Sequence, residues 1–312
     1  MTLPGADELG TATSRRGSAR PYVAAALAMV AFASNSLLTR AALDGASIDA
    51  ATFSSIRIAS GAAMLVLLMA LRRRPATDRP TRGSALPSAA LLFLYAAAFS
   101  FAYTRIGAGT GALLLFGVVQ TVMYSSAIAR GERPGAMGWS GLALAAVGLV
   151  VLVAPGVHAP DLGGALLMAV AGVAWAGYTL RGRSAQDALG STARNFVWAL
   201  PFAGVLEAGA ILGDRGAVHV TPTGVLLAVL SGAVASGLGY ALWYAVLPRL
   251  SGIQAGIIQL SPAPLAVLGG LVLLGEGLTW RVVLASALVL SGVAIGLVAP
   301  RYGVPRTPYR RS

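Results

Sequence analysis

The chain has 312 residues, of which 56% are hydrophobic and only 11% are charged. A soluble domain carries roughly 25% charged residues, so this composition excludes an ordinary soluble fold and indicates a membrane protein. The absence of cysteine excludes a disulfide framework and a thiolate metal site. The net charge is +12, and all 23 basic residues are arginines that lie mostly between apolar blocks. We therefore expect the partner of this basic chain to be a lipid bilayer and not nucleic acid.

Long apolar blocks fill most of the chain. A block of ~18 or more such residues is typical of a membrane-spanning helix. The sequence predicts an all-α membrane protein with two polar cytoplasmic tails, residues 1–20 (disordered) and 300–312 (basic). The ten predicted spans are 21–39, 51–71, 85–103, 106–129, 136–154, 163–180, 192–212, 223–247, 252–274 and 281–299.

The arginines also predict an orientation. With the N-terminus in the cytoplasm, 18 arginines fall in cytoplasmic segments and four fall outside, while Arg57 lies within a span. This bias predicts a multi-pass inner-membrane protein with both termini in the cytoplasm. The "AFA" at 31–33 resembles a signal-cleavage site, but the apolar run continues past it and nine spans follow, so we expect the first helix to be retained.

An internal repeat divides the chain into residues 21–154 and 163–299. "GERPGAMGWSGLALAAVGLVVLVAPG" (131–156) matches "GEGLTWRVVLASALVLSGVAIGLVAP" (275–300), and Glu132 and Glu276 are 144 residues apart. Each half holds five predicted spans. Because five is odd, the second half must enter the membrane upside down, as in the inverted repeats of many secondary transporters.

These two halves resemble the EamA repeats of the drug/metabolite transporter superfamily. The resemblance covers nearly all of residues 21–300 and implies a ten-helix exporter of small metabolites. "GYALWYAVL" (239–247), "AWAGYTL" (174–180) and "SPAPLAVLGGLVL" (261–273) are similar to YddG-type amino-acid exporters. One departure is that the fourth span has Val118 and Gln120 where the family often has a proline.

The motif "QLSPAP" interrupts the ninth span near its centre, and "LFGVVQ" (115–120) is its counterpart in the fourth. A proline break frees backbone carbonyls that hydrocarbon cannot satisfy. One interpretation is a central wet cavity, and the other is a packing kink whose polar groups bond between helices. The residues that we assign to this break and cavity are Gly117, Gln120, Gln259, Ser261, Pro262 and Pro264.

Aromatic residues with polar tips gather in several spans and suit amphipathic organic molecules. The alternative is an interfacial aromatic belt, which we expect for Tyr22, Tyr103 and Trp280 near span ends. Asn35 is a polar residue at a similar depth, whose alternative role is an interhelical hydrogen bond. The further substrate-binding candidates are Asn35, Tyr95, Trp175, Tyr178, Tyr240, Trp243 and Tyr244.

Two ionisable residues lie inside spans. Arg57 could meet a substrate carboxylate and Glu207 could carry a proton, or the two could pair with each other or reach the outer interface. Glu132 and Glu276 open the helices that follow them, where a carboxylate complements the helix dipole. Glycine-rich segments such as 107–117, 204–210 and 231–239 are read as close helix packing.

The sequence therefore predicts a secondary exporter of small organic metabolites, with amino acids, including aromatic ones, as the leading substrate class. Its mechanism would be alternating access, with no metal or cofactor, and the sequence is compatible with a monomer. Carriers of drugs, nucleotide-linked sugars or lipids remain alternatives. A membrane-embedded enzyme would need a base beside a nucleophile, and the histidines, His158 and His219, fall in predicted outer loops.

Overall fold

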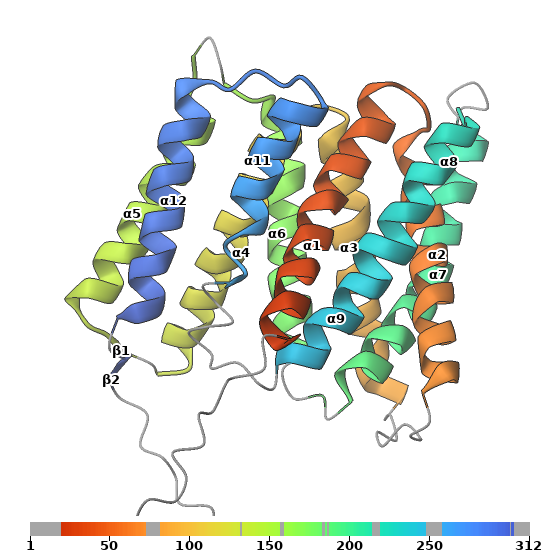
Figure 1. The fold of residues 1–312 in the computed structure, drawn as a ribbon, viewed down its shortest axis with the longest axis horizontal. Helices are drawn as coiled ribbons and strands as arrows, with labels where there is room; N and C mark the ends of the chain where they lie inside the picture. Colours follow the sequence, from red (N-terminus) through yellow and green to blue (C-terminus); the bar gives the residue numbers. More distant parts are fainter. Residues whose placement is uncertain are drawn as a thin grey trace, which may run out of the picture.

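The structure is a computed structural model that describes residues 20–72, 82–131, 133–156, 159–182, 185, 187–213, 219–247, 258–299 and 301–302. Its helices stand side by side in one bundle, with α5 and α12 at one edge and α2, α7 and α8 at the other (Figure 1). The elements are α1 (Arg20–Asp44), α2 (Ala50–Leu71), α3 (Arg82–Tyr103), α4 (Ala108–Ala129), β1 (Arg133–Pro134), α5 (Ala136–Val153), α6 (Leu162–Gly182), α7 (Ala188–Gly213), α8 (Pro222–Val229), the π-helix η1 (Leu230–Leu238), α9 (Gly239–Val246), α11 (Pro262–Leu273), α12 (Trp280–Val298) and β2 (Arg301–Tyr302).

The helices satisfy their own backbone hydrogen bonds, as a chain in hydrocarbon must. Among the described residues, eight helical stretches are long and apolar enough to cross a membrane, and α8, η1 and α9 form one of them, Pro222–Val246. Two further apolar helices, Pro262–Leu273 and Trp280–Gly296, are shorter. The predicted all-α membrane class is confirmed. The count of ten stays a prediction, because residues 248–257, and with them the start of the ninth predicted span, lie outside the described residues.

Three helix starts carry side-chain caps that the sequence encodes locally. Asp49 Oδ1 accepts the N–H groups of Ala51 and Thr52 at the start of α2, and the Thr221 and Thr279 hydroxyls accept in the same way at α8 and α12. These are ordinary N-caps.

The proline motif lies at the start of α11. Pro262 is the first residue of α11 and Pro264 lies in its first turn, where a missing N–H breaks no helical hydrogen bond. The prolines therefore lie where α11 begins, directly after the turn at residues 259–261. Figure 1 shows that α11 begins near mid-height of the bundle, so an irregular segment does occur at that depth.

Packing pairs each helix of the first half with one of the second. α2 packs on α7, α4 on α11, and α5 on α12. Other contacts between the halves come in equivalent pairs. The contact of α3 with α6 corresponds to that of η1 and α9 with α1. The contact of α4 with α6 corresponds to that of α11 with α1. The main contacts are thus preserved when the two halves trade places.

The two matching loops lie at opposite ends of α4. Glu276 accepts a hydrogen bond from the Ala108 N–H at its first turn, whereas Arg133 follows its last turn and pairs with Tyr302 of β2. At ~1.5 Å per residue, a helix of this length separates those ends by about 33 Å. Figure 1 shows β1, β2 and the start of α1 at the bottom of the bundle and the α11–α12 loop at its top. Glu132 and residues 1–19 lie outside the described part of the chain.

Candidate functional site

A cluster of aromatic rings joins α3, α6 and α9 inside the bundle. The Trp175 ring lies 4.8 Å from Tyr95, 5.5 Å from Tyr178 and 5.4 Å from Tyr240, measured between centroids, and it stacks on Tyr240 at an interplanar angle of 16°. Tyr240 in turn lies 6.3 Å from Tyr244. We call these five residues the aromatic cluster. Sequence reasoning predicted all five, and the structure brings them together.

A polar network lies against the aromatic cluster. The Ser231 hydroxyl donates to Asn35 Oδ1 at 2.5 Å, and Asn35 Nδ2 donates to the Tyr95 hydroxyl at 3.4 Å. Arg57 Nη2 donates to the same Tyr95 oxygen at 3.1 Å. The network thus joins α1, α2, α3 and η1 through one tyrosine hydroxyl.

Arg57 is the charged member of this network, and its side chain is almost completely buried, at 2% exposure. Its guanidinium lies 5.2 Å from the Tyr95 ring centre and 4.9 Å from that of Phe99. Its Nη1 has no hydrogen-bond partner among the described residues. A guanidinium stays charged in a protein, and placing one at the centre of a membrane helix costs roughly 2.5–3.5 kcal/mol on insertion scales. Ring faces return about 0.5–2 kcal/mol of that.

The pairing of Arg57 with Glu207, one of the alternatives for these two residues, is not observed among the described residues. Glu207 Oε1 instead accepts a hydrogen bond from the Thr52 hydroxyl at 2.9 Å. Within the described ranges, the ion pairs of arginine with acid involve Arg40, Arg72 and Arg105. The structure therefore describes a buried cation without a carboxylate partner.

The polar network lies nearer one end of the bundle than the aromatic cluster does. Each member of the polar network lies seven to nine residues from the end of its helical stretch on the side of the α1–α2 loop; the members are Asn35, Arg57, Tyr95 and Ser231. That spacing is about 10–13 Å of helix. Trp175 lies 13 residues along α6 from the same end, or about 20 Å. Along the bundle axis, the polar network therefore lies nearer the α1–α2 loop, and Trp175 lies deeper.

The π-helix η1 supports this arrangement. Gly232 lies so close to α2 that a Cβ there would collide with the Arg57 carbonyl and the Ser60 hydroxyl. Nine π-helical residues are unusual, and such segments occur often at functional sites. Ser231, the residue before Gly232 in η1, donates to Asn35 on α1. Ser231 was missed from the sequence, because "SGAVASGLG" reads as a packing segment.

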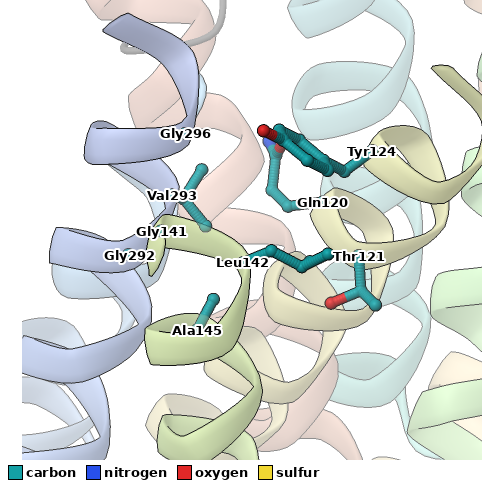
Figure 2. Close-up of a pocket in the computed structure, with 9 residues that line it drawn as sticks. All are labelled: Gln120, Thr121, Tyr124, Gly141, Leu142, Ala145, Gly292, Val293 and Gly296. Carbon is teal, nitrogen blue, oxygen red and sulfur yellow. The ribbon is translucent and has the colours of Figure 1, made fainter. Parts of the chain in front are cut away.

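Gln120 lies in a different place, a small cavity between α4, α5 and α12. Figure 2 shows Gln120 and Tyr124 projecting from α4 beside the α5 and α12 backbones, where Gly141 and Gly292 also line the cavity. Its volume is about 30 Å³. Metabolite pockets measure about 300–1,000 Å³, so this cavity accommodates water and not an organic substrate.

The structure places the remaining predicted residues in other surroundings. Trp243 belongs to a second buried cluster with Ala25, Ala28 and Met29 of α1, against which Tyr244 of the aromatic cluster also packs. The Ser261 hydroxyl donates to the Ile258 carbonyl at 2.8 Å. Gln259 is half-buried in the turn before α11.

Gly117 faces α5. A Cβ at Gly117 would lie 2.5 Å from Leu149, which gives this glycine a packing role.

Three residues were predicted to lie in an interfacial belt. Tyr22 and Trp280 are exposed, at 57% and 65%, as such a belt requires. The prediction was wrong for Tyr103, which is fully buried. Its ring packs edge-on against Phe99, and its hydroxyl donates to the Ala108 carbonyl at 3.3 Å. The short α3–α4 turn folds this tyrosine back into the bundle.

The fold and the buried cluster define a multi-pass helical membrane protein with a polar, aromatic centre. The sequence model of the EamA-like transporter family matches residues 19–154 and again residues 162–298. The chain belongs to the EamA-like transporter family, a family of membrane transporters.

Two further comparisons found proteins similar to this chain. Uncharacterized protein PA1977 of Pseudomonas aeruginosa is 51% identical over 284 residues, which cover 91% of this chain and 96% of that protein. A crystal structure of a protein with 19% identity aligns with a TM-score of 0.62 over 88% of this chain and 96% of that chain. At that identity the second match indicates a shared fold.

Proposed function

We propose that this chain is a secondary transporter that exports small organic metabolites across the inner membrane by alternating access. Amino acids, including aromatic ones, are the leading substrate class. The proposal includes ten spans in two inverted halves, with residues 21–154 as the first and 163–299 as the second. The aromatic cluster and the polar network together form the substrate site.

The main support for this proposal is that both halves of the chain contribute residues to the site. Asn35, Arg57 and Tyr95 come from the first half, whereas Trp175, Ser231 and Tyr240 come from the second. Substrate sites of inverted-repeat transporters lie at such an interface, near mid-membrane. The exchange of contacts between the halves and the opposite placement of the two matching loops support the inverted repeat.

The rings of the aromatic cluster contact one another and leave no space between them for a substrate. A substrate enters only when the halves separate, which is the motion that alternating access supplies. The paired helices α2–α7 and α5–α12 at the two edges of the bundle provide contacts about which the halves can rock. The aromatic faces then receive the apolar part of the substrate.

The test is counterflow of a labelled amino-acid panel, with tryptophan, phenylalanine and leucine among its members, into proteoliposomes. We expect uptake by the wild-type protein and at least a tenfold loss in Trp175→Ala. The matched control is Trp198→Ala on α7, because that side chain is 45% exposed and outside the site. Melting curves of each variant separate loss of transport from loss of fold.

The same assay separates two possible sites. Trp243→Ala and Gln259→Ala retain transport if the aromatic cluster is the site, and they lose it if the site lies at the start of α11. Absence of counterflow for every solute in the panel would contradict amino-acid export. Equal rates in wild type, Trp175→Ala and Trp198→Ala would move the site away from the cluster.

A further inference from the structure

We propose that Arg57 holds the substrate through a carboxylate, so that the solute is a small carboxylate with an aromatic or apolar body. This inference rests on the proposed function, because it assigns the chemistry of the same site. It concerns what the site selects, whereas the proposed function concerns what the protein does.

The first step is the unused donor. Arg57 Nη2 bonds the Tyr95 hydroxyl at 3.1 Å, but Nη1 is buried without a partner in the described part of the chain. Buried polar groups are nearly always hydrogen-bonded, and an orphaned one requires an explanation. A guanidinium presents paired donors in a plane that matches the two oxygens of a carboxylate. A bound carboxylate would satisfy the orphaned Nη1.

The second step is the charge of the surroundings. The groups that meet Arg57 are the Tyr95 hydroxyl, the rings of Tyr95 and Phe99, and, through Tyr95, the amide of Asn35. All of them are neutral, and no acid among the described residues pairs with Arg57. One guanidinium balances one negative charge. The site therefore favours a solute that carries a carboxylate and disfavours an amine without one, which would add a second buried cation with no compensating anion.

The third step is the direction of the bound solute. Arg57 is seven residues from the start of α2, whereas Trp175 lies deeper along α6 and stacks on Tyr240. The carboxylate would therefore point toward the α1–α2 loop, and the apolar body would lie among the rings of the aromatic cluster. Rings with polar tips accept such a body without leaving their own polar groups unpaired.

The experiment compares a carboxylate with its neutral and cationic analogues in the full-length protein. The probes are 3-phenylpropionate, 3-phenylpropanamide, phenylalanine and phenethylamine, with phenyl phosphate to distinguish carboxylates from phosphates. Binding is read from the unfolding temperature in detergent, and transport is read from counterflow. We expect 3-phenylpropionate and phenylalanine to bind at least tenfold more tightly than 3-phenylpropanamide and phenethylamine.

The variants assign this preference to one residue. Arg57→Gln should reduce carboxylate affinity at least tenfold and leave that of 3-phenylpropanamide unchanged. Arg57→Lys keeps the charge and should retain part of the preference, which covers the case in which Arg57→Gln does not fold. Arg281→Gln is the matched control. It is also buried, at 8% exposure, but its guanidinium donates to the Val151 and Ala154 carbonyls, away from the site.

The outcomes are separable. Carboxylate binding that depends on Arg57 without any counterflow supports the inference and contradicts the proposed function. Counterflow in which carboxylate and amide compete equally, or in which Arg57→Gln and Arg57→Lys both keep the wild-type preference, overturns the inference and leaves the exporter intact. Tighter binding of phenyl phosphate than of 3-phenylpropionate also overturns it.

Discussion

Asp187 is a single carboxylate that ties α7 to α2 at the end of the bundle away from the α1–α2 loop. Its Oδ1 accepts Arg72 Nη1 at 2.7 Å and the Gly190 N–H at 3.1 Å, and its side chain is 4% exposed. Burial alone would raise the pKa of Asp187. The hydrogen bonds from Arg72 and Gly190 and the charges of Arg72 and Arg194 outweigh burial and hold that pKa below its usual value. The folded protein therefore favours the ionised form.

We predict a pH dependence of stability from this residue. Because the folded-state pKa is lowered, the contribution of Asp187 is fully present above its unfolded pKa of about 3.9. It is lost as the pH falls through the lower, folded value. Asp187→Asn should cost roughly 1 kcal/mol at pH 6. Its melting temperature should also change less than that of wild type between pH 6 and pH 3.

Parallel melting curves for wild type and Asp187→Asn would contradict this assignment. Asp44→Asn is the matched control, since its side chain is 63% exposed where it meets Arg40.

At the residue scale, part of the site could be predicted from the sequence. Asn35 and the five aromatic residues are uncommon polar or aromatic side chains within apolar helices. Their positions along the predicted spans placed them inside the membrane. Spacing could not assign Trp243, because three residues along a helix still turn the side chain by about 60° from Tyr240. Ser231 depends on a π-helix that no sequence pattern signals.

Among the elements, α4 depends on a residue from the opposite half of the chain. Glu276 was expected to complement α12, but its Oε1 accepts the Ala108 N–H at 2.7 Å and lies 3.4 Å from Arg40 Nε. Gly107, the N-cap residue of α4, has no side chain to cap the helix. The carboxylate therefore replaces the missing cap and complements the α4 dipole.

We predict that Glu276→Gln lowers stability by about 1–2 kcal/mol, through the loss of the charge at the helix start and beside Arg40. Glu207→Gln is the comparison variant, because Glu207 accepts one hydroxyl and an amide can do the same. Denaturation in detergent measures both. Equal losses in the two variants would show that the cap contributes nothing beyond an ordinary hydrogen bond.

The α5–α12 pair depends on glycines that let the two backbones touch. A Cβ at Gly141 would lie 2.6 Å from the Gly292 carbonyl oxygen, and one at Gly292 would lie 2.5 Å from the Ala145 backbone nitrogen. The packing role predicted for the 204–210 segment was wrong, since Gly204 and Gly209 face open space. Glycine content alone does not reveal which helix face meets a neighbour.

This contrast gives a matched pair of substitutions. Gly141→Ala forces two backbones apart and should destabilise the protein by about 1–3 kcal/mol. Gly204→Ala meets nothing and should be neutral or stabilising by up to about 1 kcal/mol, because alanine favours the helix. The melting temperatures of both variants measure the difference. A Gly141→Ala protein as stable as wild type would contradict the close packing of α5 on α12.

Over the whole molecule, the apolar blocks and the weak internal repeat sufficed to predict the class of fold. Long apolar runs must form helices in a bilayer, and this constraint is strong. The ninth span was harder, because "QLSPAP" is compatible with either a kink or a helix start, and the choice depends on the tertiary neighbours of α11. Tertiary packing likewise determines which helix faces meet across the two halves, and this packing cannot be predicted from a single sequence.

The central claim is that two upside-down halves of one chain enclose the site. Because the chain has no cysteine, single cysteines report its topology without background. We would introduce Ala136→Cys beside β1 and Gly277→Cys in the α11–α12 loop, and label intact inner-membrane vesicles and intact spheroplasts with an impermeant maleimide. The account predicts that Ala136→Cys reacts from the cytoplasmic side alone and Gly277→Cys from the opposite side alone. Labelling of both positions from the same side would contradict it.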